Sequence, residues 1–439
     1  MANSLPQNLS TAVCTMTVIN NFRKELLPIL NGVSTTPLPD EQDKSFKTIM
    51  YEEGFLCFPN EIEASYRKAL KILRLMSNQS GKLISDKALE EKLVDFLLKL
   101  KYGENEEKIR REIDRHVIVF INSIKKMKSN KYLFMIPIMN LIVEGDIRMG
   151  DSSIVTLSPQ LFESLEATYC LKFSLNRKDH PDPIEWMPQI NKTKTFSIVN
   201  VEALDSQKAL EIAIQKTEIC LNILRLYSTD SSFVIRDEFK KTIVRRLIQI
   251  NIDKKTYTEV GSNINLATNH FPTTLNKDNI EMFNTKILPN VNNLLNKTED
   301  ELTPLQGDLL TAILWFGNAI KEKDKKMKFL KGMMALEALL VPDGGIGKLD
   351  IIAKRFASIV FSTAPSIRKK QVFEDMRNMY RLRSSIIHSG EGYIYEEDLE
   401  KMIAWAQITI QILLERSDKF KDLQETISKE FPIDETVCN

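Results

Sequence analysis

Hydrophobic side chains recur at helical spacing in the first third of the chain. Stretches 61–77, 86–101 and 106–127 each place apolar residues three and four positions apart. In the last stretch the shared face is formed by Ile109, Ile113, Val117, Phe120 and Ile124. The pattern predicts that residues 1 to about 130 are mostly helical after a polar leader.

The period of the hydrophobic pattern changes after residue 130. Residues 132–143 (YLFMIPIMNLIV) are apolar and partly β-branched, and Gly-Asp turns follow at 145–146 and 150–151. Further strand-like runs occupy 154–157, 168–173 and 195–201, and helical spacing returns at 205–227 and 238–250. Residues 1–300 are therefore predicted to form an α+β region with a small sheet, either one domain or two divided somewhere between 130 and 230.

The C-terminal third predicts an up-and-down helical bundle. Thr303, Pro304 and Gln306 form a helix start, with a capping box and with proline at the first helical position. Amphipathic helices are expected at 304–322, 326–341, 348–362, 368–388 and 396–416. Because short connections join them, neighbouring helices should be antiparallel. The predicted fold is mostly α, with the bundle at 301–417 and a helix or tail at 418–439.

Composition narrows the class of protein. The chain has 439 residues, of which 43% are hydrophobic and 27% charged, enough for two or more domains. We expect a cytoplasmic protein without membrane contact, because no run of about 18 apolar residues occurs and the five cysteines are odd in number and far apart. The net charge is +1, so any surface for nucleic acid must be a local basic patch.

Two charged residues fall in unusual positions of the predicted bundle. At about 100° per residue, Arg383 falls at the centre of an apolar stripe formed by Val372, Met376, Met379, Tyr380, Ile386 and Ile387. Glu337 falls at the centre of a stripe formed by Leu330, Met333, Met334, Leu340 and Val341. An unpaired buried charge costs on the order of several kcal/mol. We therefore predict that Glu337 and Arg383 form an ion pair, across the bundle or beside its open edge.

Another face of the helix at 368–388 carries a polar ridge. Its members are Arg377, Arg381, Ser384 and His388. Residues 366–388 contain six basic side chains and two acidic ones, which supplies the local basic patch. His388 directly precedes Ser389 and Gly390, where the helix should end, and the C-terminal end of a helix favours the imidazolium form. This position suits general acid–base chemistry, but a histidine at the end of a helix is more commonly a capping residue.

Three segments of the chain resemble a known family. They are residues 329–340 (FLKGMMALEALL), 354–357 (KRFA) and 380–390 (YRLRSSIIHSG). Together they resemble the Apea-like branch of the HEPN superfamily, whose hallmark is an arginine, four to six residues and a histidine; here these are Arg383 and His388. The resemblance covers about 115 residues. It implies a helical bundle that dimerises, with the motifs of two protomers facing each other. Ser384 departs from the wider superfamily, in which Asn, Asp or His often follows the arginine.

The resemblance also implies a metal-independent endoribonuclease that needs no cofactor, frequently the toxic effector of a bacterial antiphage defence or a toxin–antitoxin system. RNA carries its own nucleophile, the 2′-OH, so His388 would transfer protons and Arg383 would stabilise charge on the phosphoryl oxygens. The supporting residues would be Glu337, Ser384 and Tyr380, and the RNA-binding residues Arg377 and Arg381. One straight helix places Arg383 and His388 about 140° apart. This geometry is less awkward if the helix end unwinds near His388 or if the site combines two protomers. It also fits a rival role in which Arg383 is purely structural through its pairing with Glu337.

A second interpretation is a catalytically silent HEPN bundle that acts in dimerisation or sensing. Residues 1–300 contain no motif that indicates a ligand. By analogy with the family, this region would sense a phage-derived or cellular trigger, or restrain the nuclease.

A nucleotide or metal enzyme is poorly supported by the sequence. The run GGIGK at 344–348 is not a phosphate-binding loop, because Pro342 replaces its first glycine and Leu349 replaces the Ser or Thr that would hold magnesium. His116, His180 and His270 have no second histidine or cysteine at ligand spacing, so we expect no zinc site.

Overall fold

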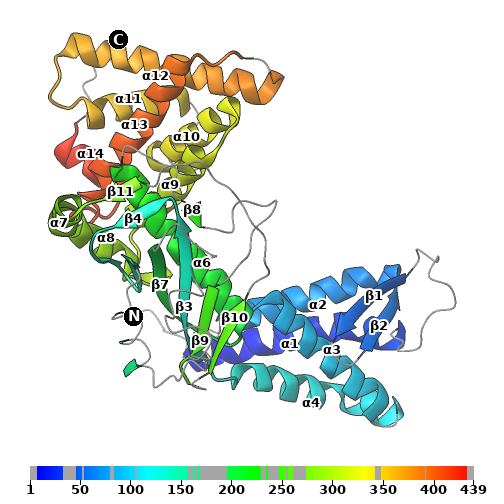
Figure 1. The fold of residues 1–439 in the computed structure, drawn as a ribbon. Coiled ribbons are helices and arrows are strands. Elements are labelled where there is room, and N and C mark those ends of the chain that lie inside the picture. Colours follow the sequence, from blue (N-terminus) through cyan, green and yellow to red (C-terminus); the bar gives the residue numbers. More distant parts are fainter. Residues whose placement is uncertain are drawn as a thin grey trace. The chain divides into compact units, whose positions relative to one another are not determined.

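The computed structural model is mostly helical with a small β-sheet, as the sequence predicts (Figure 1). It describes residues 7–32, 46–51, 54–79, 84–103, 106–156, 161, 164, 167–168, 195–228, 234–235, 247–253, 256–260, 273–341, 348–390 and 392–432. Contacts divide the chain into two compact units. The first contains Met1–Tyr132 and Val201–Ile212, and the second contains Leu133–Asn200 and Ala213–Asn439.

The first unit is built around helices α1 (Gln7–Gly32), α2 (Asn60–Gln79), α3 (Asp86–Gly103) and α4 (Glu106–Lys125). Strands β1 (Phe46–Tyr51) and β2 (Gly54–Pro59) form an antiparallel hairpin. In the core, the ring of Phe96 stacks on Phe120 with 4.2 Å between centroids. Helices α2, α3 and α4 confirm the three predicted helices to within two residues at each end.

The prediction of a polar leader is wrong, because α1 begins at residue 7. Phe22, Leu26 and Ile29 of this helix are fully buried in the core of the first unit. Their spacing of four and three positions is a helical signal. Pro28, which lies inside the helix, obscures that signal because proline is unfavourable in helix interiors.

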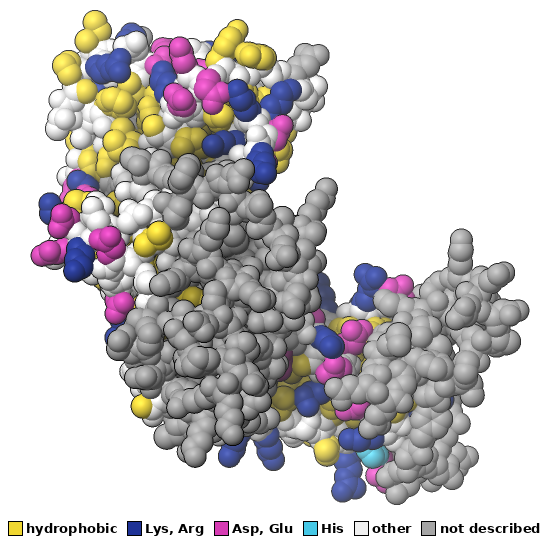
Figure 2. Space-filling model, viewed as in Figure 1, with side chains coloured by type: hydrophobic (Ala, Val, Ile, Leu, Met, Phe, Trp, Pro, Cys, Tyr) yellow, Lys and Arg dark blue, Asp and Glu magenta, His cyan; other side chains and the backbone are white. Residues whose placement is uncertain are grey.

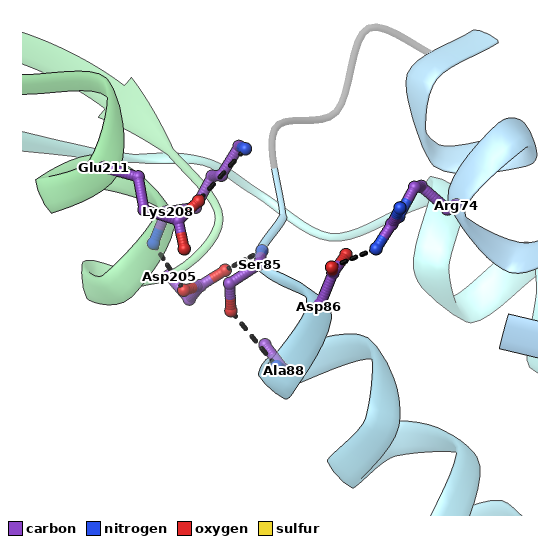
Figure 3. A network of polar contacts seen from close by, with 7 residues as sticks. All are labelled: Arg74, Ser85, Asp86, Ala88, Asp205, Lys208 and Glu211. Atoms are coloured by element: carbon purple, nitrogen blue, oxygen red, sulfur yellow. Dashed lines mark hydrogen bonds and ion pairs between the residues drawn. The ribbon is translucent and has the colours of Figure 1, made fainter. Parts of the chain in front are cut away.

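A single carboxylate, that of Asp205, joins two helix starts of the first unit (Figure 3). Its Oδ1 accepts a hydrogen bond of 2.9 Å from the backbone N–H of Lys208, in the first turn of α6 (Ser206–Tyr227). Its Oδ2 accepts a bond of 2.8 Å from the N–H of Ser85, whose own Oγ accepts from Ala88 N at the start of α3. Asp205 thereby satisfies the backbone donor of Lys208, three residues away, and that of Ser85, 120 residues away in the chain.

A seven-stranded sheet is formed largely by the second unit, in the order β10-β9-β3-β7-β6-β5 with β8 paired to β3. The strands are β3 (Asn130–Met139), β5 (Ile147–Met149), β6 (Ser152–Thr156), β7 (Thr195–Ala203), β8 (Val234–Ile235), β9 (Leu247–Asn251) and β10 (Thr256–Val260). A separate parallel pair joins β4 (Leu141–Val143) to β11 (Thr273–Leu275). Asn140, with φ at 58°, separates β3 from β4.

The strands predicted at 132–143, 154–157 and 195–201 are confirmed. The helix predicted at 238–250 is wrong over residues 247–250, which belong to β9 and pair antiparallel with β10. Short apolar runs fit either period, and pairing with a neighbouring strand decides between them. The strand predicted at 168–173 is wrong at residue 168, which is helical, and its other positions lie outside the described residues.

Helix α6 packs against one face of the sheet within the second unit. Thr217 Oγ1 donates to Ser197 Oγ on β7 at 3.0 Å, and both residues are fully buried. Cys220 Sγ lies 3.9 Å from the carbonyl oxygen of Met149 on β5. Burial raises the pKa of the Cys220 thiol to about 12.

The remaining helices follow in sequence. They are α7 (Lys277–Lys286), α8 (Leu288–Leu295), α9 (Pro304–Lys321), α10 (Lys325–Leu340), α11 (Lys348–Val360), α12 (Ser366–Ser389), α13 (Glu396–Leu414) and α14 (Leu423–Glu430). Helices α9 to α13 confirm the five predicted amphipathic helices to within two residues, and Thr303 and Gln306 form the predicted capping box. No helix in the part of the chain that the structure describes is long and apolar enough to cross a membrane.

The sheet and the C-terminal helices of the second unit are joined through α6. Glu218 accepts a hydrogen bond of 2.9 Å from Lys321 on α9 and lies 3.5 Å from the fully buried guanidinium of Arg225. The Asn222 carboxamide packs so closely against Gly317 of α9 that a Cβ atom has no room there. The boundary predicted near residue 301 therefore falls inside the second unit.

Candidate functional site

Helix α12 carries most of the predicted site residues and remains regular to its end. Its last residue is Ser389, and Gly390 follows in the left-handed conformation with φ at 68°, donating its N–H to Ile386 O at 3.1 Å. Glycine adopts this conformation without the steric cost of a Cβ atom. His388 therefore lies in the last turn of an intact helix. The alternative in which the helix unwinds near His388 is wrong.

The predicted ion pair between Glu337 and Arg383 is confirmed. Arg383 Nη2 donates to Glu337 Oε2 at 3.2 Å, and Arg383 Nε lies 3.1 Å from Glu337 Oε1. The second contact satisfies the distance of an ion pair but not the geometry of a hydrogen bond. The side chains of Arg383 and Glu337 are 23% and 21% exposed, so the pair is half-buried.

Tyr380 is the third member of this cluster. Burial raises the pKa of the Tyr380 hydroxyl, and the negative charge of Glu337 and a hydrogen bond to that carboxylate raise it further, whereas Arg383 opposes the shift. The guanidinium carbon of Arg383 lies 5.6 Å from the centroid of the Tyr380 ring, within the range of a cation–π contact. The Tyr380 ring thus contacts one face of the guanidinium, and the Glu337 carboxylate contacts one edge.

The cluster lies at the edge of the bundle core, because α10 is rotated relative to the predicted stripe. The fully buried face of α10 is formed by Phe329, Met333, Leu336 and Leu340. Leu330, Met334 and Val341, which were expected in the core, are only half-buried and share a flank with Glu337. On α12, Arg383 does share a face with the buried residues Val372, Met376, Met379 and Ile386, although Ile387 is 49% exposed. The ion pair matches the expected position beside the open edge.

The two predicted RNA-binding arginines differ in their surroundings. Arg377 Nε lies 3.0 Å from Asp350, and its Nη1 donates to Glu374 at 3.2 Å. Its charge is therefore compensated by two carboxylates. Arg381 is exposed, and its Nη1 donates to the neutral amide oxygen of Asn378 at 2.9 Å. Of these two arginines, only Arg381 keeps an uncompensated charge available to a phosphate.

His388 is exposed, and its imidazole makes no hydrogen bond or ion pair to any residue that the structure describes. Along a regular helix it lies about 7.5 Å beyond Arg383 and about 140° around the axis. Ser384, between them on the predicted ridge, is half-buried. A single protomer therefore does not direct the imidazole and the guanidinium toward one point.

The loop after α12 contributes aromatic residues that the sequence analysis missed. Tyr393 and Tyr395 are 75% and 64% exposed, and their rings meet edge to face with 4.9 Å between centroids. The backbone of Gly392, whose φ is 135°, lies so close to Ile386 that an added Cβ atom would be only 2.9 Å from that side chain. The sequence signal that could have indicated this aromatic pair was two tyrosines beside a glycine in a polar loop. Figure 2 displays exposed hydrophobic side chains intermixed with both signs of charge over the C-terminal helices.

The chemistry available at α12 is proton transfer by an exposed imidazole and charge stabilisation by a partly exposed guanidinium. Within the described ranges, no group of three or more His, Cys, Asp or Glu side chains is arranged to hold a metal ion. Comparisons of the chain with models of protein families, with characterised proteins and with solved structures give no match.

Proposed function

We propose that the chain is a metal-independent endoribonuclease of the HEPN type that acts as a dimer. The observation that carries the proposal is the combination on α12 of an exposed histidine, whose imidazole has no polar partner among the described residues, and an arginine fixed by Glu337 and Tyr380. By the resemblance to the Apea-like branch, the cellular role would be that of a toxic effector in antiphage defence or a toxin–antitoxin system. Residues 1–300 would then respond to a phage-derived or cellular trigger.

The way Arg383 is held supports a role at a phosphate. Glu337 contacts Nε and Nη2 of the guanidinium, which leaves the Nη1 donors for another acceptor. Nearly a quarter of the side chain, 23%, remains exposed. A guanidinium anchored along one edge loses little further conformational entropy when its free edge binds a phosphoryl oxygen.

His388 would move the protons of the reaction. Cleavage forms a bond from the 2′-oxygen to phosphorus and breaks the bond to the 5′-oxygen, so one group accepts the 2′-OH proton and another protonates the leaving oxygen. These two groups lie on opposite sides of an in-line displacement, which a single imidazole cannot serve. Two copies of His388 related by a twofold axis supply both groups. The products are a 2′,3′-cyclic phosphate and a 5′-hydroxyl.

A specific observation favours the second candidate, a silent dimerisation or sensing module. Glu337 already neutralises Arg383 within one protomer, and Arg383 does not point toward His388 of the same chain. In a silent module the ion pair would act only to fix α10 against α12. Replacement of His388 would then leave the cellular effect of the protein unchanged.

The test is cleavage of total RNA by the purified full-length protein in EDTA. We expect RNA but not DNA to be cut, with 2′,3′-cyclic phosphate ends, and we expect His388→Ala and Arg383→Ala to abolish cutting. Matched controls are His116→Ala and Arg368→Ala, the latter an exposed arginine at the start of α12. Equal activity of His388→Ala and wild type would end the proposal.

Co-expression of wild-type and His388→Ala chains in equal amounts tests the requirement for two histidines. If each dimer needs both, random assembly leaves about a quarter of the activity of the same amount of wild type, whereas independent sites leave about a half. A residual activity near a half would contradict the shared site without contradicting the ribonuclease assignment.

A further inference from the structure

A cavity of about 760 Å³ lies in the second unit and includes none of the α12 residues described above. Its walls come from the turn between β5 and β6, the middle of α6, the end of α8 and the first turns of α9. The turn is fixed in place because Gly150, with φ at 57°, donates its N–H to Asn292 of α8 at 2.8 Å. Cavities that hold small organic molecules commonly measure about 300–1,000 Å³.

Most of the cavity wall is apolar. Ile219, Leu294, Leu295, Leu302 and Leu310 line it, and the buried residues Met149 and Cys220 also contribute. Gly307, in the first turns of α9, leaves one wall open, because no atom lies within 4 Å of a Cβ atom added at this position. An apolar or aromatic group therefore has both contact surface and room.

The two lysines that line the cavity differ in their partners. Lys216 is paired with Asp151, at 2.6 Å between Nζ and Oδ2. Lys297 instead donates to the neutral amide oxygen of Gln306 at 3.0 Å. The nearby Glu301 carboxylate is engaged by the backbone N and the hydroxyl of Thr298, at 2.8 and 2.9 Å. The Lys297 ammonium thus lines the cavity with an amide oxygen as its hydrogen-bond partner.

We propose that this cavity binds a small organic anion that has an apolar or aromatic body and one phosphate, sulfonate or carboxylate group. The anion pairs with Lys297, where it exchanges an amide contact for a charge-assisted one, and the body lies against the leucine and isoleucine side chains of α6, α8 and α9. The proposal does not depend on ribonuclease activity.

The probe for the test is 8-anilinonaphthalene-1-sulfonate, an aromatic anion of suitable size, titrated calorimetrically into the full-length protein. We expect one molecule to bind per chain. Gly307→Trp fills the cavity, and Lys297→Met removes the cation; each should weaken binding by about tenfold or more. Matched controls are Leu314→Trp, an exposed position on the same helix outside the lining, and Lys323→Met, which is exposed.

The two tryptophan variants separate binding in the cavity from binding elsewhere. Gly307→Trp should melt no lower than wild type, because glycine is unfavourable inside a helix and a Cβ atom added at this position meets no neighbouring atom within 4 Å. The proposal is supported if only Gly307→Trp and Lys297→Met lose affinity. It is overturned if the probe shows no saturable binding, or if Gly307→Trp binds it as tightly as Leu314→Trp does.

Discussion

Replacement of Glu337 by glutamine tests how strongly the half-buried ion pair holds Arg383. At an effective dielectric constant of about 20, two unit charges about 3 Å apart attract by about 5 kcal/mol, and desolvation offsets most of this attraction. Exposed pairs contribute about 0–1 kcal/mol, and breaking a fully buried pair costs about 3–5 kcal/mol. Glu337 and Arg383 are 21% and 23% exposed, and glutamine keeps one acceptor oxygen. We therefore expect Glu337→Gln to lower the free energy of unfolding by about 1–2 kcal/mol.

The assay is urea unfolding followed by tryptophan fluorescence. Trp405 reports on the C-terminal helices because it is buried on α13, with 4.6 Å between its ring centroid and that of Phe356 on α11. A double-mutant cycle with Arg383→Met isolates the coupling between the two charges from the separate effects of each substitution.

An exposed ion pair of the same region is the matched control for this cycle. Lys325 and Glu396 form a contact, but their side chains are 60% and 57% exposed, so their coupling should be too small to measure. An equally small coupling of Glu337 with Arg383 would refute this expectation. In that case half-burial does not strengthen the coupling between the two charges, and Glu337 does not hold Arg383 in place.

The remaining predictions concern packing and titration in the second unit. Gly317→Ala should lower the free energy of unfolding by about 2–4 kcal/mol, because the new Cβ atom overlaps the Asn222 carboxamide. Gly307→Ala on the same helix should raise the free energy of unfolding by up to about 1 kcal/mol. Unfolding midpoints in urea compare the two variants, and equal effects would contradict a steric clash at Gly317. The pKa of the Cys220 thiol is raised from 9.0 to about 12 by burial, so the folded state binds the proton more tightly. The contribution of the protonated thiol to stability is complete below about pH 9 and is lost as the pH rises toward 12. Between pH 8.5 and 10, the free energy of unfolding of wild type should fall by about 1 kcal/mol more than that of Cys220→Ala. Identical decreases in the two proteins would refute this prediction.

The helices of the C-terminal region could be predicted because their signals are local. Thr303, Pro304 and Gln306 define a helix start by side-chain hydrogen bonds within four residues, and Gly390 ends α12 through its own backbone conformation. The pairing of Glu337 with Arg383 could also be predicted, since each falls on an apolar stripe of its helix.

The faces that helices bury were harder to predict than their ends. The α10 sequence is apolar on more than one side. Periodicity alone therefore grouped the half-buried Leu330 and Met334 with the buried Met333, and it missed Phe329 and Leu336. The buried network of Arg225 and Glu218 gave no local signal, because its partner Lys321 is 103 residues away from Glu218 in the chain. Such contacts depend on the packing of α6 against α9.

The path of the chain through the first unit restricts how the protein can be divided. Residues 201–212 complete that unit after an intervening segment of the second, and Asp205 among them accepts a hydrogen bond from the backbone N–H of Ser85, directly before α3. A fragment that stops at residue 132 would leave the backbone donor of Ser85 without its carboxylate. During synthesis, the first unit can become complete only after the ribosome has passed residue 212, so its folding must wait for part of its neighbour to be made.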